Sequence, residues 1–127
     1  MKVILFIPKM YSLAEMLFDG FEANGWEVKI ADYKEMLPKQ VSIFYERTVG
    51  LPNRITKYWK PSYYKEINKR YLDFIETENP DMILIYNNQY FFPETIKKIK
   101  KNSKVVFYLG DNPLWSKTFD HNLEILK

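Results

Sequence analysis

A carboxylate lies directly behind a short apolar run in the last third of the sequence. Residues 105–109 are followed by Gly110, Asp111, Asn112 and Pro113. Asp111 could act as a general base toward a hydroxyl group or accept a hydrogen bond from one, and Gly110 and Asn112 would line the same loop. The alternative is a structural aspartate that accepts hydrogen bonds from backbone amides of the turn. Asp111 is therefore the candidate catalytic residue.

Amide side chains and an aromatic residue follow a second apolar run. Asn87, Asn88, Gln89 and Tyr90 come directly after residues 82–86. Amide groups both donate and accept hydrogen bonds, which suits the hydroxyl groups of a sugar, and the Tyr90 ring could stack on a sugar face. The alternative is a polar turn whose aromatic residues pack under the next helix. The loop is therefore a candidate segment for binding a sugar, with the polar turn as the open alternative.

The segment between these two loops predicts that they lie side by side. Pro93 and Glu94 begin a short helix between the apolar runs, so the chain reads strand, helix, strand. Strands joined in this way are parallel, and the crossover is right-handed. Both loops then follow the carboxyl ends of neighbouring strands, which is where open α/β sheets bind ligands.

The rest of the sequence extends the alternation of strands and helices. Residues 2–7 and 26–31 predict two strands, and residues 12–24 predict a helix between them. Residues 62–78 predict a long helix, whereas residues 41–47 are compatible with a strand or a helical turn. This order predicts an α/β fold, a Rossmann-like three-layer α/β/α arrangement with a parallel sheet of order 2-1-3-4.

The loop after the first predicted strand is a further candidate for binding. Lys9, Tyr11 and Ser12 lie where a helix begins, and the free amides of a helix N-terminus attract anions. The loop contains no glycine, so the glycine-rich fingerprint of dinucleotide-binding folds is absent. The alternative is a capped helix with a solvated lysine.

Basic residues alternate with tyrosine and tryptophan between residues 54 and 70. The only acid in this stretch is Glu66, and the basic residues are Arg54, Lys57, Lys60, Lys65, Lys69 and Arg70. Basic and aromatic side chains together suit an anionic membrane surface or a phosphate-bearing acceptor. The alternative is a helix face that is simply exposed to solvent, which gives the same alternation of basic and aromatic residues.

The composition excludes several classes of function. The 127 residues include no Cys and one His, which excludes thiol catalysis and makes a metal site unexpected. A net charge of +3 predicts no nucleic-acid partner. No apolar run approaches the ~20 residues of a membrane span, and the first run is too short for a signal peptide. We expect a cytoplasmic protein, with peripheral contact to the inner membrane face as a further option.

The longer motifs resemble one known family. NPDMILIYNNQYFFPETIKKIK followed by VVFYLGDNP is similar to the N-terminal domain of GT-B glycosyltransferases of the spore-maturation-protein (CgeB-like) group. The segment LPNRITKYW and the opening VILFIP with NGWEVKIADY are similar to the same group. The resemblance spans nearly the whole chain.

This resemblance implies an acceptor-side domain. Residues 1–127 would be the Rossmann-like N-terminal domain of a glycosyltransferase that acts on a cell-envelope glycan or glycoprotein. A nucleotide sugar would bind a C-terminal domain that is absent from this sequence, so this chain would hold no cofactor and would not transfer sugar alone. Residues 9–12, residues 87–89 and Asp111 would line the acceptor side. Asn112 stands where many members carry a second Asp.

Two other interpretations stay open. One is a non-catalytic flavodoxin-like or receiver-like ligand-binding domain, although Pro8 and Lys9 stand where a receiver has acidic residues. The other is a membrane-surface interaction domain that uses the basic stretch. The predicted amphipathic helix with Phe119, Leu123 and Leu126 continues to the last residue, and we expect it to belong to a larger architecture.

Overall fold

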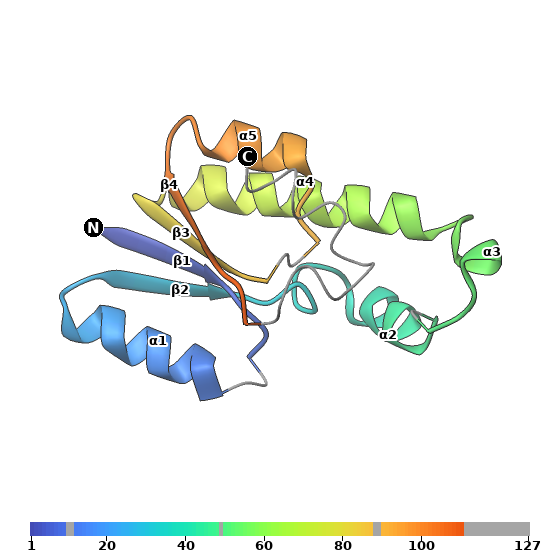
Figure 1. The fold of residues 1–127 in the computed structure, drawn as a ribbon, viewed down its shortest axis with the longest axis horizontal. Coiled ribbons are helices and arrows are strands. Elements are labelled where there is room, and N and C mark those ends of the chain that lie inside the picture. Colours follow the sequence, from blue (N-terminus) through green and yellow to red (C-terminus); the bar gives the residue numbers. More distant parts are fainter. Residues whose placement is uncertain (10–11, 49, 88–89, 111–127) are drawn as a thin grey trace.

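Four parallel strands form the sheet at the centre of the protein (Figure 1). The computed structural model describes residues 1–9, 12–48, 50–87 and 90–110. Along the chain, the strands are β1 (Lys2–Phe6), β2 (Glu27–Ala31), β3 (Met82–Tyr86) and β4 (Lys104–Tyr108). Their order in the sheet is β2-β1-β3-β4, and each neighbouring pair is parallel. The expected α/β class and strand order are confirmed.

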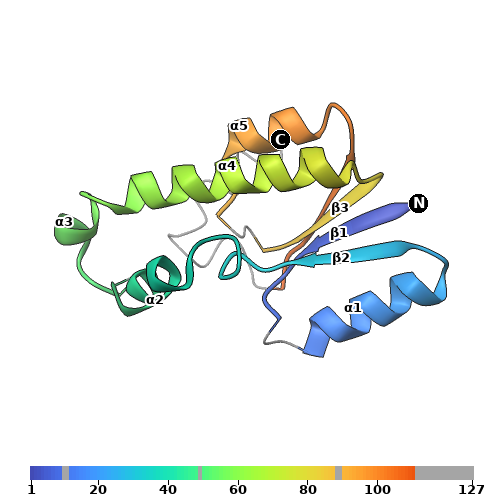
Figure 2. The same cartoon turned by 180° about the vertical axis from the view of Figure 1, so that it is seen from behind.

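Helices cover both faces of the sheet, which gives the expected three layers (Figures 1 and 2). Helix α1 (Ser12–Ala23) lies on one face, and α4 (Lys60–Glu78) and α5 (Pro93–Ile99) lie on the other. A sheet covered in this way needs strands that are apolar on both faces. Strand β1 meets this need, since its side chains from Val3 to Phe6 are completely buried.

Alternation along the central strands divides the core into two clusters. Val3 and Leu5 pack with Ala14 of α1, whereas Ile4 and Phe6 join the cluster on the α4 side. The register places Leu5 opposite Leu84 of β3, and Leu84 belongs to the α1 cluster as well.

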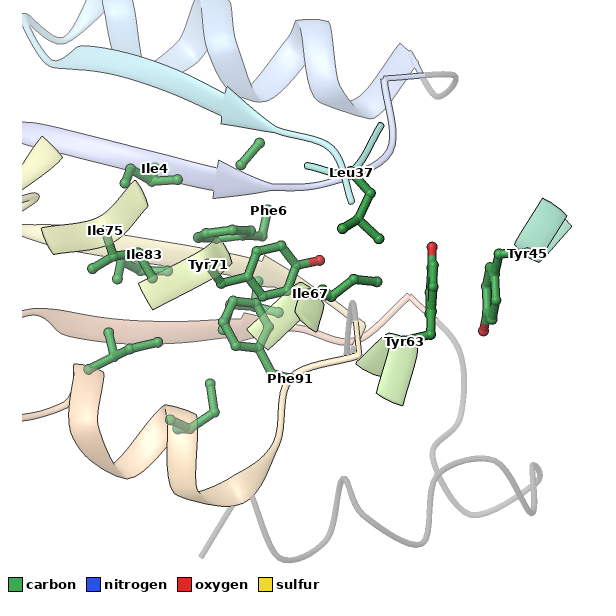
Figure 3. Close-up of a cluster of buried hydrophobic side chains, with 14 residues drawn as sticks. Ile4, Phe6, Leu37, Tyr45, Tyr63, Ile67, Tyr71, Ile75, Ile83 and Phe91 are labelled. Atoms are coloured by element: carbon green, nitrogen blue, oxygen red, sulfur yellow. The ribbon is translucent and has the colours of Figure 1, made fainter. Parts of the chain in front are cut away.

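Aromatic rings fill the core on the α4 side (Figure 3). The ring centroid of Phe6 lies 4.8 Å from that of Tyr71 and 4.9 Å from that of Phe91, and the Tyr71 and Phe91 rings stack with a centroid separation of 4.4 Å. Phe91 is only 1% exposed. For the loop after β3, the sequence left open whether its aromatic residues bind a ligand or pack under a helix. The burial of Phe91 confirms packing for this residue.

Two helices occupy the region that the sequence left open. Residues 41–47 lie within α2 (Lys39–Thr48), and α3 (Asn53–Thr56) follows. The amides of Val41 and Ser42 both donate to the carbonyl oxygen of Pro38, at 2.9 and 3.1 Å, and so close the first turn of α2. Ser42 and Tyr45 are the buried residues of this helix, and their spacing of three residues suits one helical face.

The predicted helix ends are largely confirmed. The predicted stop at Asn79 is a left-handed cap with φ 44°, whose amide donates to the carbonyl oxygen of Ile75. Gly25, which follows α1 in the sequence, has φ 78°, a conformation that glycine adopts without a steric penalty. Helix α4 begins at Lys60, two residues before the predicted start, with Pro61 in its first turn.

Candidate binding site at the carboxyl edge of the sheet

Asn87 joins the carboxyl ends of β3 and β4. Its backbone amide donates to the carbonyl oxygen of Tyr108 at 2.8 Å, and its side-chain Oδ1 accepts from the amide of Gly110 at 3.0 Å. Asn87 has φ 51°, in the left-handed region where asparagine is enriched. The structure therefore brings two of the predicted acceptor residues, Asn87 and Gly110, into direct contact.

Some of the predicted site residues lie outside the described residues: Tyr11, Asn88, Gln89, Asp111 and Asn112. Their roles, including the catalytic role of Asp111, stay predictions.

Asp32 positions the loop after β1. This carboxylate follows β2 directly and is 5% exposed. One of its oxygens accepts from the amide of Lys9 and the other from the amide of Lys34, both at 3.0 Å. The sequence analysis missed Asp32, although its place directly after a predicted strand is the same signal that singled out Asp111.

The Lys9 side chain pairs with a carboxylate. Its Nζ lies 2.7 Å from Oε2 of Glu35, and both side chains are about half exposed. This pairing offsets the positive charge that would attract an anion to the loop. Ser12 is exposed and begins α1.

Five tyrosines meet beside the carboxyl edge, and we call them the tyrosine cluster. Its members come from the loop after β2, from α2, from α4 and from the loop after β3: Tyr33, Tyr45, Tyr63, Tyr64 and Tyr90. The rings of Tyr45 and Tyr63 stack at 3.9 Å, and those of Tyr64 and Tyr90 stack at 5.0 Å. Tyr33 meets Tyr90 edge to face at 5.1 Å. Only Tyr90 was a predicted acceptor residue.

The hydroxyl groups of this cluster differ in how they are satisfied. The hydroxyl oxygens of Tyr45 and Tyr64 lie 2.9 Å apart and share a hydrogen bond. Figure 3 shows that the stacked rings of Tyr45 and Tyr63 point their hydroxyl ends in opposite directions. Tyr63 is 8% exposed, and its hydroxyl has no hydrogen-bond partner within the described part of the chain. Such a buried, unpartnered group costs about 1–3 kcal/mol.

Asn68 holds the loop that carries Tyr90. This α4 side chain is 4% exposed. Its Nδ2 donates to the carbonyl oxygens of Tyr64 and Tyr90, and its Oδ1 accepts from the amide of Phe92, each at 2.8 Å. Tyr90 has φ 63°, which is uncommon for a bulky side chain. Asn68 stabilises this unusual turn, and the sequence analysis missed it.

The phenol groups of Tyr33, Tyr45, Tyr63 and Tyr64 are uncharged at neutral pH. Burial raises the pKa of Tyr33, Tyr45 and Tyr63, and the neighbouring Tyr90 raises each of them further. Burial also raises the pKa of Tyr64, although its hydrogen bond to Tyr45 acts in the opposite direction. The cluster thus offers neutral hydroxyl groups and ring surfaces rather than charge.

The basic residues of the predicted stripe divide between two places. Lys57 and Lys60 line a cavity of about 300 Å³ whose walls include the rings of Tyr64 and Phe92. The ammonium of Lys60 lies 5.8 Å from the centre of the Tyr64 ring. This cavity therefore shares a wall with the tyrosine cluster.

The remaining basic residues of the stripe are exposed. Arg54 belongs to α3, and Lys65 and Lys69 lie four residues apart on α4. Arg70 pairs with Glu66, with 3.0 Å between Nε and Oε1. Their exposure is compatible with both interpretations of the stripe, a solvated helix face and a surface that contacts anionic lipid.

Neither a metal cluster nor a membrane-crossing helix is seen in the described ranges. No three His, Asp or Glu side chains gather there in a way that could hold a metal ion. No helix there is both long and apolar enough to cross a bilayer. Comparisons with protein-family models, curated proteins and solved structures found no match. The resemblance to GT-B enzymes therefore rests on the sequence motifs.

We expect Gly110→Ala to disturb the end of β4. A Cβ at this position would lie 2.6 Å from the hydroxyl oxygen of Tyr86 and 3.0 Å from two of its ring carbons, so the ring has to move. The Tyr86 ring stacks on Tyr108 at 5.7 Å. Overpacking of this kind costs about 1–3 kcal/mol, and we expect a loss near the low end because a side chain can yield. Urea unfolding measures the loss.

A double-mutant cycle checks the cause. Tyr86→Phe removes the oxygen at 2.6 Å, so the cost of Gly110→Ala should be smaller in that background. A cost that is the same in both backgrounds would contradict a clash with Tyr86.

Proposed function

We propose that the chain is the acceptor-binding, Rossmann-like half of a glycosyltransferase and that a hydroxyl-rich glycan binds at the tyrosine cluster. The Tyr63 hydroxyl carries this proposal, because it is buried and has no partner among the described residues. Buried polar groups are nearly always hydrogen-bonded in proteins. A sugar hydroxyl can both donate to and accept from such a phenol, and so satisfies it.

The surroundings of Tyr63 favour a neutral ligand with an apolar face. Tyr33, Tyr64 and Tyr90 are half-buried, so part of each ring is open to contact. The phenols of Tyr33 and Tyr64 stay protonated at neutral pH because burial raises their pKa, and the charge of Lys9 is offset by Glu35. A sugar needs hydroxyl partners and an aromatic surface, and the tyrosine cluster offers both.

The proposed reaction is the one that the resemblance to GT-B enzymes implies for an acceptor bound at the carboxyl edge. An acceptor hydroxyl oxygen would form a bond to the anomeric carbon of a nucleotide sugar, and the bond from that carbon to the diphosphate would break. A carboxylate, for which Asp111 is the candidate, would take the hydroxyl proton. The diphosphate would leave on a separate donor domain, and the product would be a cell-envelope glycan or glycoprotein.

A flavodoxin-like or receiver-like role has less support from the described residues. A receiver needs a cluster of free carboxylates behind its first strand. Asp32 is the nearest candidate, but it is buried and each of its oxygens accepts from a backbone amide.

Tyr63→Phe separates ligand binding from stability. The change keeps the stacked ring and removes only the unpartnered hydroxyl, so we expect the free protein to become more stable by about 1 kcal/mol. We expect sugar affinity to fall about fivefold to tenfold, since one hydrogen bond to the ligand is lost. Titration of the isotopically labelled protein with neutral disaccharides such as cellobiose, maltose and diacetylchitobiose, followed by NMR, measures the affinity.

Tyr58→Phe is the matched control, because Tyr58 is 79% exposed and lies outside the tyrosine cluster. It should change neither stability nor affinity. If none of the disaccharides shifts the resonances of the tyrosine cluster, or if Tyr63→Phe binds as well as the unmodified chain, the proposed site is wrong. Titration with flavin mononucleotide in place of sugar tests the flavodoxin-like alternative directly.

A further inference from the structure

Exposed apolar side chains are concentrated in one part of the molecule. We call α2, α3 and the neighbouring residues Leu51, Lys57 and Tyr58 the helical tip, which extends beyond the carboxyl ends of the strands in Figures 1 and 2. The large apolar side chains exposed there are Val41, Ile43, Phe44, Leu51, Ile55 and Tyr58. Elsewhere in the described ranges, only Met1, Met16 and Tyr108 share this exposure.

The packing of α2 explains why these side chains face outward. This helix buries only Ser42 and Tyr45, and the Ser42 hydroxyl donates to the carbonyl oxygen of Lys34 at 2.8 Å. The rest of the helix surface has no layer of protein over it within the described chain. Phe44 is 54% exposed even though its ring meets Trp59 at 5.4 Å. The helical tip thus presents apolar area that the fold itself does not use.

Positive charge surrounds this apolar area. The tip carries Lys39, Arg47, Arg54 and Lys57, and all four are exposed. None of them forms an ion pair with another described residue. Glu46 is the only acid between residues 39 and 58, and its carboxylate pairs with Lys34 at 2.7 Å. The charged groups of the tip that lack an ion-pair partner among the described residues are therefore all basic.

We propose that the helical tip docks on an anionic lipid surface. Apolar and aromatic side chains enter the interface between headgroups and acyl chains, and basic side chains contact the lipid phosphates. The cavity beside the tip, about 300 Å³ and lined by Lys57 and Lys60, has room for a headgroup phosphate. Charge complementarity selects this partner, since the lipid supplies both the negative charge and the apolar layer. The inference does not depend on sugar binding.

Vesicle co-sedimentation tests the docking. We expect the chain to bind vesicles of phosphatidylcholine mixed with phosphatidylglycerol, to bind pure phosphatidylcholine weakly, and to lose binding as salt increases. Arg54→Gln with Lys57→Gln should weaken binding about 30-fold, because each basic residue near such a surface contributes about fivefold and the two factors multiply. Ile55→Ser with Tyr58→Ser should weaken it about tenfold through lost apolar contact.

Matched controls keep the test specific. Lys97→Gln with Lys98→Gln removes the same charge from exposed positions on α5, and Met16→Ser removes an apolar side chain that is 69% exposed on α1. Both should bind like the unmodified chain. Tyr58→Ser alone, at a side chain that is 79% exposed, serves if the double variant does not fold.

Three results would overturn the docking surface. The first is an equal loss of binding in the α5 control, which would indicate net charge alone. The second is unchanged binding when Tyr58 and Ile55 are replaced. The third is a concentration-dependent dimer in sedimentation velocity that the Ile55 and Tyr58 changes abolish, which would make a second copy of the chain the occupant.

Discussion

Asn68→Ala is expected to lower the free energy of unfolding by about 3 kcal/mol. The Asn68 side chain makes three hydrogen bonds at 2.8 Å to backbone atoms of Tyr64, Tyr90 and Phe92. Alanine leaves the Tyr90 carbonyl and the Phe92 amide without this partner in a mostly buried setting. The left-handed turn at Tyr90 then loses its support, so sugar affinity should fall as well. Urea unfolding measures the stability and NMR titration the affinity.

Two further variants separate the hydrogen bonds from the helix. Lys69→Ala changes an exposed neighbour on α4 and should shift stability by less than about 0.5 kcal/mol. Asn68→Asp keeps an acceptor for the Phe92 amide but places a carboxylate against the Tyr64 and Tyr90 carbonyl oxygens, so we expect it to be at least as harmful as alanine. If Asn68→Ala costs no more than Lys69→Ala, the loop does not depend on this side chain.

The sheet could be predicted from the sequence because its signals are local. The apolar runs at 2–7, 82–86 and 105–109 are too long and too uniform for exposed loops, and the helices between them fix a parallel direction. β4 begins and ends one residue earlier than predicted, a typical uncertainty at strand ends. The observed order β2-β1-β3-β4 is the predicted one, and right-handed crossovers then determine which face of the sheet each connecting helix covers.

Helix α2 was harder to predict because its propensities conflict with its packing. Val41 and Ile43 are β-branched and favour a strand. The burial of Ser42 and Tyr45 against the rest of the fold stabilises the helix instead. That burial depends on contacts with residues far away in the sequence. Tyr45, for example, stacks on Tyr63 of α4.

The tyrosine cluster could not be predicted for the same reason, because it depends on contacts between residues that are far apart in the sequence. Sequence analysis selected residues of the loops that follow the strands, among them Asn87, Tyr90 and Gly110 of the candidate site. Tyr45, Tyr63 and Tyr64 come from helices and enter the site through tertiary contacts. Asn68 carried no signal beyond being a polar residue on the apolar side of α4, between Tyr64 and Tyr71.

Raising the pH above 10 is expected to unfold the protein through its tyrosines. Burial raises the pKa of Tyr71 well above the ordinary value of 10.0, and burial together with a hydrogen bond to Tyr64 raises that of Tyr45. Below pH 10, both phenols are protonated in the folded and the unfolded chain, so stability is at its full value. Above pH 10, only the unfolded chain releases these protons, so stability falls by ~1.4 kcal/mol per pH unit for each tyrosine.

Comparing the slope of stability against pH between variants isolates this effect, because the titrating groups that the variants share contribute equally to each of them. In urea unfolding between about pH 8 and pH 11, Tyr71→Phe should leave the pH dependence of the stability unchanged below pH 10 and should reduce the slope above pH 10 by ~1.4 kcal/mol per pH unit. Tyr71 is completely buried, whereas Tyr58 is 79% exposed, so Tyr58→Phe should leave the slope unchanged. A slope that is the same in Tyr71→Phe and Tyr58→Phe would show that the Tyr71 phenol ionises in the folded state. The α4 face of the sheet would then have to admit water beside Phe6 and Phe91.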